Sequence, residues 1–467
     1  MMTSRSALVA AVLCLVAPAA APPSAHACHF ASHYRLMEEE MGMPIPPSIQ
    51  AVLHLMEADL TQEAPVAEGS TACVDGLAGE YPCSQVDLMA RLPTADIGGG
   101  SGNDVWGWTD PVTGHEWAIM GRTNGTAFVD VTDPANPVYM ANLPTAASSN
   151  TWRDMKVYAD HAFIVGDFVG DHGMQVFDLN RLRDLRNPPV ILDPIDDLAA
   201  HYTEFDSAHN IVINEESGFA YVVGGSSGDE TCNAGLHIID VRVPAAPVFA
   251  GCFGADGYTH DAQCVTYHGP DPDHQGAEIC FASNTDTLTV VDVTNKLGPV
   301  QLSRTTYSGS GYTHQGWLTP DHRYFLVDDE LDEQFFGHNT RTYTWDVSNL
   351  DSPVLEGFFE ASGPSIDHNQ YVQSNYTFQA NYRRGLRILR IVDPENAALE
   401  EAAFFDTYPA NDDPSFSGAW STYPYFASGT VLVSDINRGL FVLRPLLAIF
   451  ADGFESGDLS AWSEAVP

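Results

Sequence analysis

The chain has 467 residues, and its 62 acidic residues outnumber its 20 basic residues, which gives a formal net charge of −42. This excess excludes nucleic acid and anionic membrane surfaces as partners, because both are bound through clustered Lys and Arg. With 44% hydrophobic and 18% charged residues, the composition is that of a folded globular protein and not of a disordered acidic chain.

The N-terminus has the pattern of a secretory signal peptide. Arg5 precedes an apolar run over residues 7–21, and Ala25, His26 and Ala27 form an A-x-A cleavage site. We therefore expect residues 1–27 to be removed and the protein to be exported to the periplasm, the outer cell surface or the medium. Whether the new first residue, a cysteine, carries a lipid stays open. No other apolar run reaches the length of a transmembrane helix, so none is predicted.

Residues 28–84 are predicted to form an N-terminal extension. Its residues 31–60 have a helical pattern that Pro44, Pro46 and Pro47 interrupt, which indicates a short helical cap packed on the following domain.

In an exported protein the cysteines are expected to form disulfides rather than metal sites. The two cysteines that flank a Gly-rich turn should pair, and so should those on neighbouring strands of one repeat. The predicted pairs are Cys73–Cys83, Cys232–Cys252 and Cys264–Cys280, with Cys28 left over. Bonding of Cys252 to Cys264 or Cys280 is the main alternative.

A short apolar strand that ends in Asp or Arg recurs seven times, at intervals of 44 to 62 residues. Each copy lies in a unit of four short apolar runs separated by Gly, Pro, Asn or Asp. The copies are residues 125–130, 173–178, 235–240, 287–292, 341–346, 385–390 and 439–444. Four antiparallel strands in each of seven units predict an all-β fold, a seven-bladed β-propeller over residues 85–445. A row of separate sandwiches is disfavoured, because a unit of about 50 residues is small for burying a core alone.

The sequence also indicates how the ring closes. The last unit lacks an obvious fourth strand, and residues 88–95 closely match residues 139–146, which form the outer strand of the first unit. We therefore predict that residues 86–92 supply the outer strand of the last blade, which would hide the edges of both blades.

Several segments resemble the bacterial choice-of-anchor B proteins, which are built of LVIVD repeats. The similar segments are residues 81–83, 115–130, 170–174 and 258–264, and the resemblance covers residues 70–445. It implies an exported propeller that reaches the cell surface by one of several anchors, and it implies no settled activity. The acidic tail over residues 446–467 resembles short tails of secreted proteins of gammaproteobacteria; a sorting role and a disordered end are both open.

The start of each innermost strand carries an aromatic or imidazole side chain. Because inner strands surround the propeller axis, equivalent positions form a ring at one mouth of the central channel. Four successive units place His in this position and the other three place Trp: His209, His260, His314 and His368, and Trp106, Trp152 and Trp420. For the tryptophans, packing at the mouth competes with stacking on a ligand.

Acidic residues should surround this mouth, because the loops between the second and third strands lie on the same face. These loops and the histidine neighbours carry Asp167, Asp171, Asp229, Glu230, Asp286, Asp328, Asp329 and Glu330, and Asp261 and Asp367. Such carboxylates could orient the imidazole rings. Solvated turns compete with Ca²⁺ sites in these loops, since no D-x-[DN]-x-[DN]-G motif is present.

Two functions from different classes follow. The first is an exported or cell-surface scaffold, expected to be a monomer, that presents one propeller face to a protein or a small-molecule ligand. The second is a metal-dependent enzyme, an oxidoreductase, that uses the four histidines to hold Zn, Cu or Fe, with Ca as a further candidate ion. Alternatively, the histidines only lock neighbouring blades together. No G-x-S-x-G elbow, P-loop or helical H-E-x-x-H motif offers another chemistry.

Overall fold

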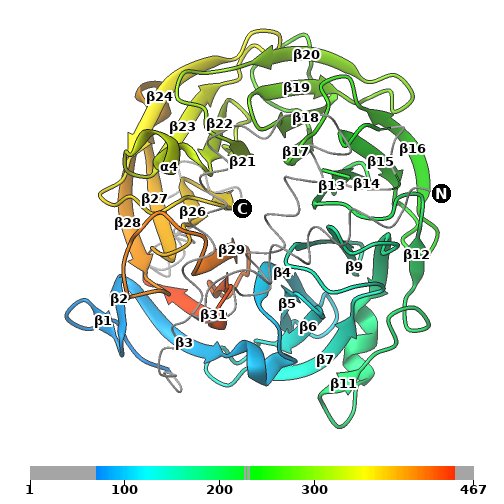
Figure 1. The fold of residues 1–467 in the computed structure, drawn as a ribbon, viewed down its shortest axis with the longest axis vertical. Helices are drawn as coiled ribbons and strands as arrows, with labels where there is room; N and C mark the ends of the chain where they lie inside the picture. The colour runs from blue at the N-terminus through cyan, green and yellow to red at the C-terminus, as the bar shows by residue number, and fades with distance from the viewer. Residues whose placement is uncertain (1–69, 226–227, 229–231, 448–467) are drawn as a thin grey trace, which may run out of the picture.

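The computed structural model describes residues 70–225, 228 and 232–447. Seven sheets of four to six strands follow one another around a central axis and close into a ring (Figure 1). The predicted seven-bladed β-propeller is therefore confirmed. The predicted signal peptide, the helical segment 31–60, Asp229, Glu230 and the tail from residue 448 lie outside the described residues.

In each blade the strands are antiparallel, and the first strand lies at the axis. Blade 1 comprises β4 (Gly102–Thr109), β5 (Glu116–Arg122), β6 (Gly125–Asp130) and β7 (Val138–Pro144). Blade 2 comprises β8 (Arg153–Tyr158), β9 (His161–Gly166), β10 (Met174–Asp178) and β12 (Ala200–Tyr202). Blade 3 comprises β13 (Asn210–Asn214), β14 (Phe219–Val223), β15 (Leu236–Asp240) and β16 (Val248–Phe253). Blade 4 comprises β17 (Asp261–Thr266), β18 (Glu278–Ser283), β19 (Leu288–Asp292) and β20 (Val300–Thr305). Blade 5 comprises β21 (Thr313–Leu318), β22 (Tyr324–Asp329), β23 (Arg341–Asp346) and β24 (Val354–Glu360). Blade 6 comprises β25 (Gln370–Gln373), β26 (Tyr376–Ala380), β27 (Leu386–Asp393) and β28 (Ala398–Phe405).

The seventh blade joins the two ends of the propeller. It consists of β29 (Ala419–Tyr423), β30 (Val431–Asp435), β31 (Gly439–Pro445) and β3 (Val86–Leu92), which comes from the N-terminal side of the chain. β3 runs antiparallel to β31, from Val86 opposite Pro445 to Leu92 opposite Leu440 (Figure 1). The predicted closure by residues 86–92 is thus confirmed, and the ladder removes the open edge that each end would otherwise expose.

The Asp that ends several of the repeated strands has a structural role. In β6, β15, β19 and β23 its Oδ1 accepts a hydrogen bond from the backbone N–H two residues later, at 2.7–3.1 Å. Asp side chains favour such turns because they imitate a backbone acceptor. The repeated Asp in the sequence therefore marks a turn that leads the chain to the outer strand of the blade. Its role is structural rather than chemical.

The chain before β3 also joins the propeller. β1 (Leu77–Ala78) and β2 (Tyr81–Ser84) extend the blade 6 sheet beyond β28. The predicted disulfide Cys73–Cys83 is confirmed there, with a Cα–Cα distance of 6.0 Å. Residues 77–84 of the predicted extension are thus continuous with a blade.

The second predicted disulfide, Cys264–Cys280, is also confirmed and joins directly paired residues of β17 and β18. The third, Cys232–Cys252, stays a prediction. Sγ of Cys232 lies 3.7 Å from Nδ1 of His237, and His237 is the cross-strand partner of Cys252. Both sulfurs therefore belong to the same edge of blade 3.

Few elements depart from the blade pattern. A short helix, α4 (Asp332–Phe336), follows β22, and β11 (Val190–Ile191) pairs in parallel with β7, which ties blade 2 to the rim of blade 1. In the described part of the chain, no helix is long and apolar enough to cross a membrane.

The closing ladder can be tested at Leu88, which is fully buried and packs in the apolar cluster between blades 6 and 7. Leu88→Ala should lower the free energy of unfolding by about 2–5 kcal/mol, because it removes buried methyl groups and leaves a cavity. Val138→Ala, on the exposed rim strand of blade 1, should change it by no more than about 0.5 kcal/mol. Chemical denaturation measures both, and equal losses would contradict the proposed importance of the closing strand.

Candidate functional site

The four histidines lie in one arc at the mouth of the channel where the innermost strands begin. His209 and His260 directly precede β13 and β17, His314 is the second residue of β21, and His368 lies two residues before β25. Centroids of successive rings are 4.5, 4.2 and 4.3 Å apart. All four residues are buried. The repeated position in the sequence thus becomes a continuous row of imidazoles in space.

Two of the rings are oriented by carboxylates from the loops predicted to surround the mouth. Nδ1 of His209 lies 2.8 Å from Oδ2 of Asp167, and Nδ1 of His314 lies 2.9 Å from Oδ1 of Asp328. A carboxylate at one ring nitrogen places the proton there, so that Nε2 keeps its lone pair.

The other two rings are oriented by backbone carbonyls of the next blade. Nδ1 of His260 lies 2.9 Å from the carbonyl oxygen of His314, and Nδ1 of His368 lies 2.5 Å from that of Trp420. These contacts do lock neighbouring blades, as the blander interpretation of the repeat expects. They also leave Nε2 of both rings as the basic nitrogen, which is the arrangement of a metal-binding imidazole.

Glu330, between β22 and α4, brings a carboxylate to two of these nitrogens. Its Oε2 lies 3.9 Å from Nε2 of His314, and its Oε1 lies 3.7 Å from Nε2 of His368. One ligand atom from each of the three residues lies within 4.8 Å of the others. The hydroxyl of Tyr382 donates a hydrogen bond to Oε1 at 2.7 Å and holds the carboxylate in place. The distances from Glu330 to the two imidazole nitrogens are too long for hydrogen bonds, and they leave room between the three groups.

Burial sets the protonation of this cluster. Burial, together with the neighbouring imidazoles, holds the pKa of His314 well below its usual range. Burial lowers the pKa of His368 to about 3, although the carbonyl of Trp420 opposes the shift. Both rings are therefore neutral near pH 7. Burial raises the pKa of Glu330 to about 7, against the hydrogen bond from Tyr382. A cation between these groups would favour the carboxylate form.

The remaining predicted acids separate into distinct environments. Oδ1 and Oδ2 of Asp329 accept hydrogen bonds from Gly311 N–H and from the Tyr307 hydroxyl, so this carboxylate closes a turn. Asp286 is exposed and pairs with Arg304 at 3.0 Å, and Asp171 is exposed. None of these three carboxylates is a ligand candidate in the described residues. Asp171 and Asp286 are exposed, as solvated turns require, whereas Asp329 is buried.

The two acids that adjoin histidines in the sequence do not contact them. Asp261 is buried, and burial, with the negative charge of Asp154, raises its pKa to about 8. Burial likewise raises the pKa of Asp367 well above its usual range, and neither of its carboxylate oxygens has a hydrogen-bond partner among the described residues. Adjacency in sequence is therefore a poor guide to contact here.

Two of the three tryptophans lie at the predicted mouth. The rings of Trp152 and His209 are 6.1 Å apart, and those of Trp420 and His368 are 4.8 Å apart. Both tryptophans belong to an apolar cluster with Tyr258, Tyr312, Tyr382 and Phe416 that packs over the histidines. Both indoles therefore have packing contacts at this mouth.

Trp106 does not belong to this mouth, contrary to the sequence-based prediction. It lies four residues beyond Gly102, where β4 begins, and its ring contacts those of Tyr371 and Tyr423 at 5.4 and 5.2 Å. β4 starts earlier than the other inner strands and has a register shift between Gly102 and Val105. Trp106 therefore lies farther along its strand than the position that the histidines occupy in their strands, towards the opposite mouth of the channel.

Sequence analysis also missed residues at the site. Tyr382 occupies the loop between the second and third strands of blade 6, where only acids were sought. Asp332 and Glu333 of α4, which follow Glu330 closely in the chain, are buried, and both oxygens of Glu333 lack a hydrogen-bond partner in the described chain. The run of five acids over residues 328–333 was the available signal, but acidic runs are usually solvated.

No protein-family model matches this chain, and a search of curated proteins finds no match. Among solved structures it is similar to the β-propeller domain of Myceliophteria thermophila Swd1, with 10% identity, coverage of 76% of this chain and 100% of that chain, and a TM-score of 0.48. It is similar to hydrazine synthase of Kuenenia stuttgartiensis, with 11% identity, coverage of 73% and 94%, and a TM-score of 0.49. It is also similar to the periplasmic gluconolactonase of Pseudomonas aeruginosa, with 11% identity, coverage of 67% of this chain and 86% of that chain, and a TM-score of 0.44. At these identities nothing about the site or an activity is transferred.

The buried acids predict that the metal-free protein loses stability as the pH rises. The pKa of Asp261 rises from 3.8 to about 8 on folding, so between these values the folded carboxyl keeps a proton that the unfolded chain releases. The free energy of unfolding should then fall with pH, by about 1.4 kcal/mol per unit for each such group. Asp261→Asn has no such titrating proton. In metal-free buffer between pH 5 and 8, the free energy of unfolding of this variant should therefore fall less steeply with pH than that of the wild type.

Denaturant unfolding at several pH values measures these slopes. Asp133→Asn, at an exposed loop position, is the control for an equal change in charge and should keep the wild-type slope. Identical slopes for the wild type and Asp261→Asn would contradict the raised pKa.

Proposed function

We propose that the protein holds a transition-metal ion at the histidine mouth of the propeller and that this centre is its functional site. The observation that carries the proposal is the convergence of Nε2 of His314, Nε2 of His368 and the carboxylate of Glu330 within 4.8 Å. Metal–ligand bonds of about 2.0–2.2 Å from a shared ion allow ligand atoms to be this far apart. The neutral state of both imidazoles supports the proposal, because only the unprotonated ring binds a metal.

The donor set indicates the kind of ion and of chemistry. Two imidazoles and one carboxylate suit Fe²⁺ or Zn²⁺, and three protein ligands leave coordination positions open for water or a substrate. His260, whose ring lies 4.2 Å from that of His314, could fill one of them. His209 is the farthest along the arc, and its ion pair with Asp167 suits a supporting role. An oxidoreductase is the class of enzyme that we propose, because two histidines and one carboxylate with open positions are typical of non-haem iron oxygenases.

A binding scaffold is the second candidate. The predicted acidic face supports it less than the sequence suggested, because Asp167, Asp328, Asp329 and Glu330 are buried and would not meet a partner. A scaffold that uses another face remains consistent with the fold. If the protein purifies without metal and its fold survives loss of His314, the scaffold is the better account and the histidines are blade-locking residues.

We also propose that the protein is exported and belongs with the choice-of-anchor B proteins. The A-x-A site after the apolar N-terminal run and the two disulfides support export, because structural disulfides persist in oxidising compartments. The family proposal is supported by the segments quoted from the sequence and by the seven blades.

Export predicts a defined N-terminus. The protein isolated from its native cells should begin at Cys28, because cleavage follows Ala27. Intact-mass and N-terminal peptide analysis measure this and also show any lipid on Cys28. A mature protein that retains residues 1–27 and is found in the cytoplasm would contradict the proposal.

Metal binding predicts stoichiometric metal in the native protein and its loss in two variants. His314→Ala and Glu330→Gln should each lower the affinity for Fe²⁺ or Zn²⁺ by about 100-fold or more, because each removes one of three ligands. Elemental analysis of protein from its native compartment gives the metal content. Competition titrations and the absorption bands of added Co²⁺ give the affinity and the coordination of the site.

His237→Ala is the matched control, since His237 is as deeply buried as His314 but lies outside the arc. It should keep the wild-type metal content. The proposal is wrong if the native protein is free of metal, or if both ligand variants fold and bind Co²⁺ as the wild type does.

A further inference from the structure

A second concave site lies at the opposite mouth of the channel, where the innermost strands end. Its volume is about 590 Å³, within the usual range for small-molecule sites. All seven innermost strands line it, including Trp106 of β4, Lys156 of β8, Gln263 of β17 and Trp317 of β21. The histidines stand at the starts of these strands, so this pocket is separate from the proposed metal centre.

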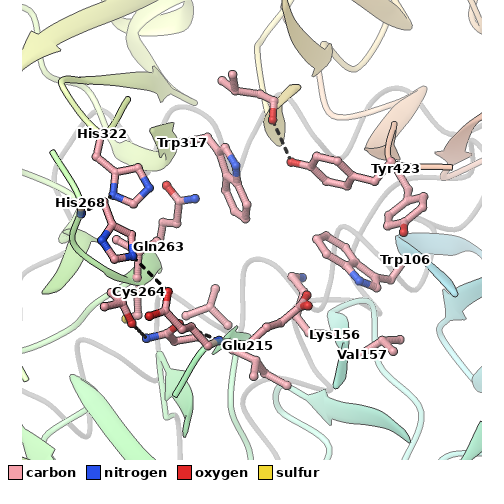
Figure 2. Close-up of a pocket in the computed structure, with 18 residues that line it drawn as sticks. Trp106, Lys156, Val157, Glu215, Gln263, Cys264, His268, Trp317, His322 and Tyr423 are labelled. Carbon is pink, nitrogen blue, oxygen red and sulfur yellow. Dashed lines mark hydrogen bonds and ion pairs between the residues drawn. The ribbon is translucent and has the colours of Figure 1, made fainter. Parts of the chain in front are cut away.

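One side of the pocket is an aromatic wall formed by Trp106, Trp317, Tyr423 and Tyr425. The buried ring of Tyr371 lies behind this wall and joins Trp317, at 4.9 Å, to Trp106, at 5.4 Å. Trp106 then contacts Tyr423 at 5.2 Å, and Tyr423 contacts Tyr425 at 5.4 Å. Figure 2 shows Trp106 and Tyr423 on the side opposite His268 and His322. Such a wall offers π faces to a ligand that lies against it.

The single lysine in the wall does not make the pocket positive. Nζ of Lys156 lies 2.6 Å from Oδ1 of Asp154 and 3.4 Å from Oδ2 of Asp104. These carboxylates raise the pKa of Lys156 against the effect of burial, so the ammonium is charged and compensated. The ammonium also lies 4.6 Å from the ring centroid of Trp106, which shows that this wall accepts a cation on a ring face.

Glu215 is the uncompensated charge of the pocket. It follows β13 at the rim and is exposed, and across residues 70–225, 228 and 232–447 no hydrogen bond or ion pair engages its carboxylate; partial burial raises its pKa. Glu215 lines the same pocket as Tyr423 and Tyr425, and its negative charge adds to burial in raising the pKa values of both tyrosines. The neighbouring Glu216, in contrast, pairs with His268 at 3.1 Å.

We infer that this pocket binds a small organic cation, an alkylated ammonium group, between the aromatic wall and the Glu215 carboxylate. Aromatic faces with an unpaired carboxylate attract an ammonium ion by two additive interactions and repel an anion. The net charge of −42 also concentrates cations around the protein. Neither the histidine mouth nor its metal is needed for this binding.

Choline and its uncharged carbon isostere, 3,3-dimethylbutan-1-ol, test the inference, because they share one shape and differ in charge. Isothermal titration calorimetry should show that choline binds at least about tenfold more tightly than the alcohol. Glu215→Gln should weaken choline binding by about tenfold and leave the affinity for the alcohol unchanged. Trp317→Ala should weaken both.

Glu356→Gln, an exposed acid on the rim strand β24, controls for net charge and should bind choline as the wild type does. Circular dichroism checks that each variant is folded. The inference is overturned if choline and the alcohol bind equally, if neither binds, if Glu215→Gln binds choline normally, or if a neutral sugar such as glucose binds where choline does not.

Discussion

Closure of the ring by the ladder between β3 and β31 is the constraint on which both sites depend. An open array of blades could splay, and equivalent positions in successive blades would then trace a curve of undefined radius. Once the N-terminal strand completes the last blade, the starts of the inner strands are fixed on one circle. The row of imidazoles, with centroids 4.2–4.5 Å apart, is a direct consequence of that circle.

The ring also explains why so many charges are buried. A chain with a net charge of −42 places several carboxylates in its channel, where Lys156 is compensated by Asp154 and Asp104. Buried carboxyl groups without a close counter-ion remain protonated, and the raised pKa values of Asp261 and Asp367 express this cost. A protein would not keep such groups for stability, since apolar residues of similar volume would pack as well. Glu330 lies beside the neutral imidazoles of His314 and His368, which favours a role in holding a cation.

The sequence determined the fold well because a propeller repeats its information. Seven copies of one strand pattern, and the duplicated segment that became β3, were each visible without knowledge of any contact. The same logic placed the four histidines correctly relative to one another. It failed for Trp106, because β4 is longer and shifted in register, so counting from the repeat displaced the residue towards the other mouth. It could not find Glu330 as the partner of two imidazoles, or Tyr382 as its anchor, because loops do not repeat and their side chains are positioned only by the folded ring.

The two proposed sites share strands but not atoms. An innermost strand such as β17 has six residues and spans about 20 Å, so a ligand against Trp317 and Glu215 does not reach the imidazoles at the other end. Buried ionisable groups of the inner strands, including Lys156 with its partner Asp154, and Asp261, lie between the ends of these strands. A ligand in the pocket would therefore influence the metal centre only through the electrostatics of the channel. An added positive charge near Glu215 would act electrostatically on the buried carboxylates of the inner strands, whereas a neutral ligand of the same shape would not. The shape of a ligand at one mouth can thus change without disturbing the other mouth, whereas a change in its charge acts on both, provided that the ring that aligns them stays closed.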